Sequence, residues 1–260
     1  MTARRRAPGC GFWWAKTPAP FSPATGSPRS KTIFSEEEWV AVRLTLLVAA
    51  RAVLFGLPPA LLAAYALARW RFPGRGLLNA VVNLPLVLPP VVVGWLLLLM
   101  FGVRGPLGAW LFSHFGIRLA FTSAGASLAC GVMIFPQMVR AVRQGLESVD
   151  RGLEDAARTL GATRLDCFLN ITLPLIAPGV LVAALAGYVA ALGEFGAVIT
   201  FAANIPGQTQ TLPLAIFTAL QVPGGEAQAG RLAGVSILLA LAGLGAAEWA
   251  GRGLQRWLGR

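Results

Sequence analysis

The chain has 260 residues, of which 56% are hydrophobic and 13% are charged, and its mean hydropathy is +0.66. Because soluble domains carry about 25% charged residues, this composition excludes an ordinary soluble protein and predicts an all-α membrane protein with about five spanning helices. The net charge of +11 does not indicate nucleic-acid binding, because most Lys and Arg residues lie at the ends of apolar runs and orient membrane helices there.

Residues 1–35 differ in composition from the rest of the chain. They are rich in Arg, Pro, Ser and Gly and contain no sustained apolar run. A signal peptide needs such a run, so we expect this segment to be disordered or to be a start-site extension that is not native. Residues 36–260 are expected to form one membrane domain.

Five apolar stretches are expected to cross the membrane, at about residues 40–68, 77–101, 121–142, 173–192 and 232–250. The second contains Pro85, Pro89 and Pro90, which predict a kink inside a packed bundle. Residues 102–120 are expected to form a connection with a short interfacial helix. The apolar stretch Leu212–Leu220 is too short to cross and is expected to be a re-entrant or periplasmic helix.

The distribution of basic residues predicts the orientation of these spans. The connection after the first span, the polar segment 147–170 and the C-terminus hold most of them, so all three are expected in the cytoplasm. Five spans then place the N-terminus in the periplasm. The basic residues of the first 35 positions oppose that placement, which favours the interpretation that this segment is an extension.

The polar segment 147–170 has the pattern of two short helices. Gly161 can end the first helix in a left-handed conformation, and Thr163 can cap a second one three residues before Asp166. Periodicity alone does not distinguish a docking surface from an ordinary amphipathic connector. The apolar residues recur at helical spacing and would form one face of the first helix: Leu153, Ala156, Ala157 and Leu160.

The order Asp155-Ala156-Ala157, then Gly161, then Ile171-x-Leu173-Pro174 resembles the EAA loop of ABC-importer permeases, with Asp155 in the place of the usual Glu. The resemblance implies a type I ABC importer permease fold whose coupling loop, residues 150–174, docks into a separate ATP-binding subunit. The sequence contains no G-x-x-x-x-G-K-[ST] motif, the glycine-rich loop that binds the phosphates of ATP, so we expect another polypeptide to bind ATP. The implied coupling residues are Glu154, Asp155, Ala156, Ala157, Gly161, Leu173 and Pro174.

A second resemblance concerns the cargo. The segments 84–94, 104–108, 192–197 and 204–211 are similar to molybdate permease subunits, and the resemblance covers about residues 34–257. Sulfate permeases share the Gly-Glu-aromatic-Gly element, so sulfate and tungstate remain alternatives. The residues implied at the gate or along the pathway are Pro89, Pro90, Gly193, Glu194, Phe195, Gly196, Asn204, Thr209 and Thr211.

Two ionisable residues lie inside or near the apolar runs. Glu194 is a poor ligand for a dianion because like charges repel, so we expect it to accept hydrogen bonds or pair with a basic group at the gate, unless it is a simple interfacial residue. Gly193 and Gly196 are expected to allow close approach at a subunit contact. Arg51 can snorkel, pair across the bundle or face an anion pathway. No motif explains it, and a tolerated substitution is the simplest account.

The remaining residues do not favour enzymatic chemistry. His114 is the only histidine, and the cysteines at 10, 130 and 167 are widely separated, so we expect no catalytic triad, metal site, disulfide framework or cofactor. An ion-coupled secondary carrier would show internal repeats and several intramembrane charges, and this sequence shows neither.

The resemblance to ABC-importer permeases implies transport by alternating access in a bacterial inner membrane. The implied partners are two ATPase subunits, a periplasmic molybdate-binding protein and membrane lipid, and a twofold assembly adds a second copy of this chain.

Overall fold

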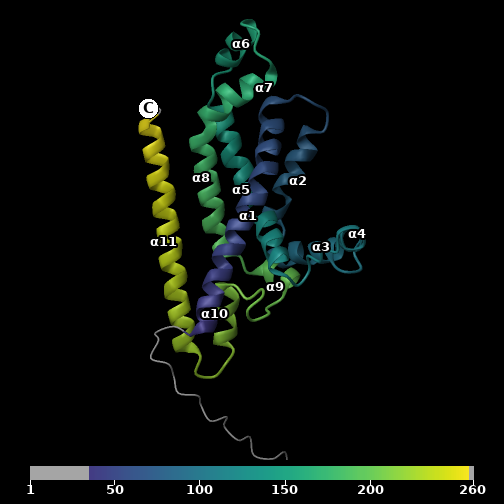
Figure 1. Cartoon of the computed structure of the whole chain (residues 1–260), viewed down its shortest axis with the longest axis vertical. Helices are drawn as coiled ribbons and strands as arrows, with labels where there is room; N and C mark the ends of the chain where they lie inside the picture. Colours follow the sequence, from purple (N-terminus) through teal and green to yellow (C-terminus); the bar gives the residue numbers. More distant parts are fainter. Residues whose placement is uncertain (1–34, 258–260) are drawn as a thin grey trace, which may run out of the picture. The chain divides into compact units, whose positions relative to one another are not determined.

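The computed structural model describes residues 35–257, and residues 1–34, on which most of the expectation for the N-terminal segment falls, lie outside that range. The described residues from Glu36 onward belong to one compact unit. They form helices and connections without a strand (Figure 1). The helices are α1 (Glu36–Arg69), α2 (Arg75–Val87), α3 (Pro90–Phe101), α4 (Pro106–Phe115), α5 (Ser123–Glu147), α6 (Arg151–Thr159), α7 (Arg164–Cys167), the π-helical turn η1 (Phe168–Thr172), α8 (Leu173–Leu192), α9 (Gly196–Ala202), α10 (Leu212–Leu220) and α11 (Glu226–Trp257).

Helices long and apolar enough to cross a membrane occur where the sequence predicted them. Four such segments lie in the described residues, Glu36–Arg69, Ser123–Glu147, Leu165–Leu192 and Glu226–Arg252, and α2 with α3 makes a fifth if the bent pair counts as one span. The prediction of about five spans is therefore confirmed. The stretch Leu212–Leu220 is a separate helix of 9 residues, as its length required.

The expected second span is broken rather than kinked. The axes of α2 and α3 differ by 116°. Leu88 and Pro89 between them are extended, with ψ of 142° and 135°. Proline cannot donate a hydrogen bond and forces the preceding residue out of the helical region, so the pair Pro89-Pro90 ends α2 and starts α3 in a new direction. The prediction of a single kinked helix over 77–101 was wrong in this respect.

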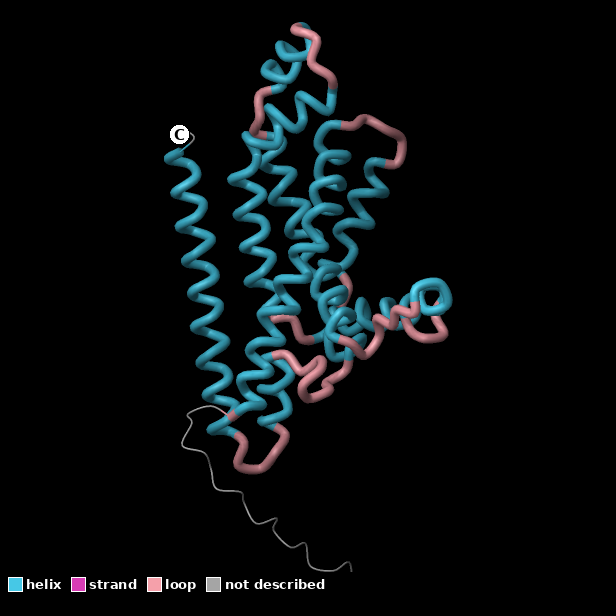
Figure 2. Tube along the Cα trace, in the orientation of Figure 1, coloured by secondary structure: helices cyan, strands magenta, loops and turns pink. Residues whose placement is uncertain are grey.

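The core lies where α1, α5 and α8 run side by side (Figure 2). It contains many small residues, including Ala49, Ala64, Ala126 and Ala129, each of which has no exposed surface. Small residues allow helix backbones to approach closely where the surroundings provide no hydrophobic driving force between helices. By contrast, α11 packs mainly on α8 and α10, and only 11% of its apolar window is buried.

The two ends of this bundle carry different elements. Figure 1 shows α6 and α7 at the end where α11 finishes, and α10 at the opposite end, where α1 starts. Ion pairs confirm this arrangement: Arg69 at the end of α1 lies 2.9 Å from Glu154 of α6, and Glu38 near its start lies 2.9 Å from Arg231 of α11. The polar segment 147–170 and the last turns of α11 therefore share one end, as the distribution of basic residues predicted.

A short helix also forms in the expected connection 102–120. This is α4, whose large apolar side chains Trp110, Phe112 and Phe115 are exposed. The guanidinium of Arg118 lies over the Phe112 ring, 4.5 Å from its centroid. An aromatic helix with a nearby cation is typical of the boundary between the apolar and polar parts of a membrane.

Candidate functional site

Helix α6 is closed at both ends by local hydrogen bonds. At its start, the Asp150 carboxylate accepts a hydrogen bond from the Gly152 N–H at 2.9 Å. At its end, the Ala162 N–H donates to the Ala157 carbonyl and the Gly161 N–H to the Arg158 carbonyl, both at 3.1 Å. This is a Schellman motif, and Gly161 has the φ of +94° that the motif requires. The predicted left-handed end of the helix at Gly161 is confirmed, and its role in coupling stays a prediction.

Thr163 caps the start of α7, as predicted, and Asp166 completes a capping box there. The Asp166 N–H donates to the Thr163 hydroxyl oxygen at 3.2 Å, and the Thr163 N–H donates back to the Asp166 carboxylate at 3.1 Å. The two hydrogen bonds satisfy one free backbone donor at the start of α7 and hold the chain at the turn between α6 and α7.

The apolar face of α6 points away from the rest of the chain. Leu153 is 50% exposed and Leu160 is 90% exposed, and Leu165 of α7 is 66% exposed. Asp155 is also exposed and forms no hydrogen bond or ion pair with any described residue. Asp155 lies about 160° around the helix from Leu153, at about 100° per residue, so the carboxylate and the leucine are exposed on different sides of α6. Large apolar groups left exposed outside the membrane spans are typical of a surface that a partner covers. We call the exposed residues Leu153, Asp155, Leu160 and Leu165 together the α6–α7 face.

The neighbouring residue Glu154 has the opposite orientation. Its Oε1 atom accepts hydrogen bonds from Arg69 at 2.9 Å and from the Thr172 hydroxyl at 2.7 Å. The side chains of Arg69 and Glu154 are only 9% and 20% exposed, and Thr172 is buried. Glu154 therefore fastens α6 to the end of α1 and to the turn that leads into α8. We call Arg69, Glu154 and Thr172 the α1–α6 clamp. Sequence reasoning missed Arg69 and Thr172.

The segment behind the clamp continues into α8. Phe168 of η1 packs edge-on against Tyr65 of α1, with ring centroids 5.1 Å apart. Pro174 lies in the first turn of α8, directly after the π-helical turn η1. Leu173 directly follows η1, so the predicted coupling residues Leu173 and Pro174 join the α6–α7 segment to a membrane span without a break.

A second group of predicted residues surrounds the start of α9. The Glu194 carboxylate accepts a hydrogen bond from the Ala197 N–H at 3.0 Å, which satisfies a free donor in the first turn of that helix. Phe195 packs against Phe217 of α10 with centroids 5.2 Å apart. Glu194 is thus a hydrogen-bond acceptor, as one of the expectations for it stated.

Gly196 allows a close approach within the chain. A methyl group there would lie 2.7 Å from the Pro90 Cβ atom, and one at Gly94 would lie 2.7 Å from the Ala197 carbonyl oxygen. These glycines let α3 and α9 pack together, so Pro90 and Gly196 meet. Gly193 is exposed and has no such contact with described residues, and its place at a subunit contact stays a prediction.

The polar residues after α9 stabilise the loop that they belong to. The buried Thr209 hydroxyl accepts from the Ile205 N–H at 3.0 Å and donates to the Ala203 carbonyl at 3.1 Å. Asn204 donates to the Thr218 hydroxyl of α10 at 2.7 Å. The Thr211 hydroxyl is buried and finds no hydrogen-bond partner among the described residues. Thr209 and Asn204 thus make hydrogen bonds within this chain. Their role along a pathway stays a prediction.

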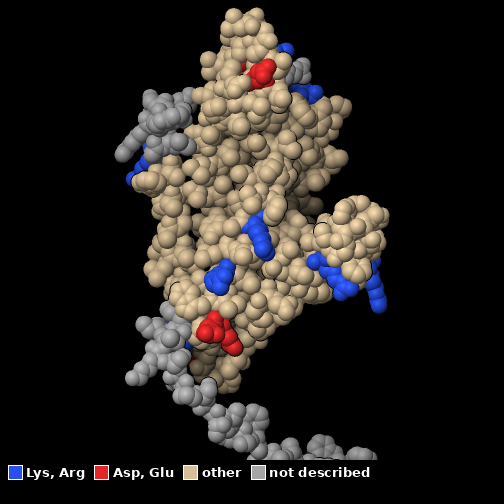
Figure 3. All heavy atoms as spheres, viewed as in Figure 1, with Lys and Arg blue, Asp and Glu red and all other residues tan. Residues whose placement is uncertain are grey.

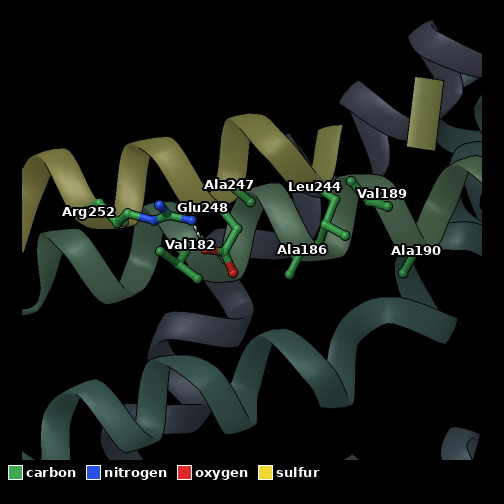
Figure 4. A pocket seen from close by; sticks show the side chains of 9 residues that line it. Val182, Ala186, Val189, Ala190, Leu244, Ala247, Glu248 and Arg252 are labelled. Atoms are coloured by element: carbon green, nitrogen blue, oxygen red, sulfur yellow. Dashed lines mark hydrogen bonds and ion pairs between the residues drawn. The ribbon is translucent and has the colours of Figure 1, made fainter. Parts of the chain in front are cut away.

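A groove on the surface of the bundle gathers none of these residues. It has a volume of about 540 Å³, lies between α8 and α11 and is mostly apolar, with the Glu248–Arg252 ion pair at one end (Figure 4). A smaller groove of about 290 Å³ lies beside it and is lined by Gly193 and residues of α10 and α11. The structure therefore brings together one group around α6 and another around α9, at different levels of the bundle (Figure 1).

Most of the chain matches one protein family. Residues 56–254 match the family described as binding-protein-dependent transport system inner membrane component. The molybdenum transport system permease protein ModB of Escherichia coli K12 is 53% identical over 220 residues, covering 85% of this chain and 96% of that protein. ModB of Haemophilus influenzae is 47% identical over the same shares. The sulfate transport system permease protein CysT of Escherichia coli K12 is 40% identical, covering 76% of this chain and 73% of that protein.

Solved structures show the same fold at lower sequence identity. A chain of a bacterial alginate ABC transporter, in complex with an alginate pentasaccharide-bound periplasmic protein, is similar with a TM-score of 0.65 and 21% identity, covering 86% of this chain and 80% of that one. A chain of the MetNI methionine ABC transporter in inward-facing conformations has a TM-score of 0.61 and 17% identity, covering 84% and 94%. At these identities the likeness concerns the fold.

Proposed function

The chain belongs to the family of binding-protein-dependent transport system inner membrane components, and from that premise we propose that its cargo is molybdate. It is a multi-pass permease subunit of an ABC transporter with the type I importer fold, and ATP hydrolysis is carried by a separate subunit. The observation that carries the proposal is the 53% identity to a molybdenum permease across 96% of that protein, against 40% to a sulfate permease.

The α6–α7 face is the surface that docks the ATPase subunit in this proposal. Its exposed leucines and Asp155 have no covering element among the described residues. Behind it, the α1–α6 clamp joins α6 to the end of α1 and the start of α8. A displacement of α6 by the ATPase is therefore transmitted to two membrane helices at once. Glu154 positions α6, and Asp155 contacts the ATPase subunit.

The sidedness follows from the same arrangement. Basic residues follow α1 and occur near the end of α11, and α6 lies at this end of the bundle. From the positive-inside rule we infer that this end lies in the cytoplasm and the start of α1 in the periplasm. The periplasmic partner is then an oxyanion-binding protein, which docks near the α10 end.

The pathway forms between two copies of this chain in a twofold assembly. The proposed gate is the region where α3 meets α9, which includes Pro89, Pro90, Glu194, Phe195 and Gly196. The hydrogen bond from the Ala197 N–H holds the Glu194 carboxylate at the start of α9. Helices α3 and α9 move together in this proposal, because Gly94 and Gly196 allow contacts too close for any larger residue. Alternating access then opens this gate to one side of the membrane at a time.

Competition for uptake tests the cargo. Inner-membrane vesicles that contain this chain, its ATPase subunit and its binding protein are expected to accumulate radiolabelled molybdate in an ATP-dependent manner. We expect unlabelled tungstate to compete because of its equal charge and shape, and a tenfold excess of sulfate to leave most of the uptake intact. Full competition by sulfate at equal concentration contradicts molybdate as the preferred cargo.

A further inference from the structure

One face of α1 combines exposed apolar residues with two unpaired arginines. Leu47, Leu54 and Leu62 on this face are 43%, 67% and 72% exposed. Arg43 precedes Leu47 by one helical turn, and Arg51 lies between Leu47 and Leu54. Both arginines are exposed and form no hydrogen bond or ion pair with a described residue. Figure 3 shows isolated basic atoms within an otherwise uncharged surface along the course of α1. We call this surface the arginine face of α1.

The contacts of its neighbour Ala52 place Arg51 in the middle of the apolar bundle. A methyl group at Gly131 of α5 would lie 3.6 Å from the Ala52 carbonyl oxygen, so these two residues share a level. Gly131 is about 12 Å along the axis of α5 from Ser123 and about 14 Å from Arg140, at about 1.5 Å per residue. Arg51 therefore lies near the centre of an uncharged stretch of the span.

A guanidinium at this depth needs water or a counter-charge. Arginine remains ionised under all physiological conditions, and charged residues in spans face a bundle interior or a water-filled cavity. The bundle side of α1 is closed, because Ala49 and Ala52 are buried against neighbouring helices. The Arg51 side chain therefore points away from the bundle. On that side it meets either water or lipid hydrocarbon, and contact with hydrocarbon costs more free energy.

The gate residue Glu194 lies at the same level. Cys130, next to Gly131, has its Sγ atom 3.9 Å from the Ala191 carbonyl oxygen, and the Glu194 N–H donates to that same oxygen at 3.3 Å. A carboxylate at this depth repels a dianion. A guanidinium at the same depth offsets that repulsion, and its planar fork of donors matches two oxygens of a tetrahedral oxyanion.

We propose that the arginine face of α1 lines the water-filled pathway, and that Arg51 is a fixed cationic site for the oxyanion at the level of Glu194. The identity of the anion rests on the proposed function, but the access of water to Arg51 does not. Arg43, about 12 Å nearer the start of α1, guides the anion toward this site.

Thiol accessibility tests the water-lined face. In the full transporter with its natural cysteines replaced by Ser, Arg51→Cys is expected to react at least tenfold faster with a membrane-impermeant, anionic methanethiosulfonate than Leu241→Cys does. Leu241 is 61% exposed on α11 and provides a span residue outside this face. Equal rates at the two positions overturn the proposal, whether lipid or an acidic residue of a second copy covers Arg51.

Uptake separates the anion site from water access. Arg51→Leu is expected to lower molybdate uptake at least tenfold at unchanged membrane content, and Arg51→Lys is expected to keep most of it. Normal uptake by Arg51→Leu overturns the anion site even if the thiol of the Arg51→Cys variant is labelled. A wild-type transporter that moves no molybdate contradicts the proposed cargo instead. The thiol-labelling result then still decides whether water reaches the arginine face of α1.

Discussion

Replacing Glu154 with Ala is expected to detach α6 from α1 and to lower the free energy of unfolding by about 3–5 kcal/mol. The variant leaves the Arg69 guanidinium, which is only 9% exposed, without its counter-charge, and it removes the acceptor of the Thr172 hydroxyl. Thermal unfolding in lipid nanodiscs measures the loss of stability, and vesicle uptake should fall with it.

The matched control is Glu147→Ala. Glu147 pairs with Arg143 at 2.7 Å, but the two side chains are 51% and 32% exposed, so its loss should cost at most about 1 kcal/mol. A double variant, Arg69→Met with Glu154→Leu, removes both charges and should recover much of the stability. If Glu154→Ala unfolds like Glu147→Ala, the α1–α6 clamp does not hold α6.

Reversing the charge of Asp155 is expected to affect coupling without affecting folding. Asp155→Lys changes an exposed residue with no partner among the described residues, so the protein should insert and unfold like wild type. At a docked interface a wrong charge costs several kcal/mol, which corresponds to a loss of uptake of at least about tenfold. ATP hydrolysis and molybdate uptake, measured in the same vesicles, should no longer rise together.

Glu226→Lys makes the same charge change at the other end of the molecule. Glu226 is exposed at the start of α11, far along the chain from the α6–α7 face. This end is where the periplasmic protein is proposed to dock, so the variant is expected to leave uptake and hydrolysis unchanged or to lower both together. In either case it should keep the wild-type ratio of uptake to hydrolysis. Normal uptake by Asp155→Lys would show that this residue does not contact the ATPase subunit.

Local chemistry made much of the coupling segment predictable from sequence. Gly161 ends α6 in a left-handed conformation, and Thr163 with Asp166 starts α7, because each device involves residues within a few positions of one another. The spans were predictable for a similar reason, since apolar length determines them. Leu153 and Leu160, which the sequence pattern assigned to one face of the first helix, are both exposed.

Long-range geometry was not predictable in this way. Adjacent carboxylates at 154 and 155 look equivalent in sequence, and only the fold shows that Glu154 faces Arg69, 85 positions away, while Asp155 faces outward. The pair Pro89-Pro90 signalled a disturbance, but the angle of 116° depends on how α3 packs against α9. Gly196 likewise gave no indication that its close neighbour would be Pro90.

Photo-crosslinking from the α6–α7 face tests the central claim, that this face docks a separate ATPase subunit. A benzoyl-phenylalanine placed at Leu160, which is 90% exposed, should crosslink to the ATPase subunit in the assembled transporter. The same group at Leu220, 62% exposed at the other end of the bundle, should not. An ATPase crosslink from position 220, or none from position 160 in a complex that hydrolyses ATP and imports molybdate, would contradict the account.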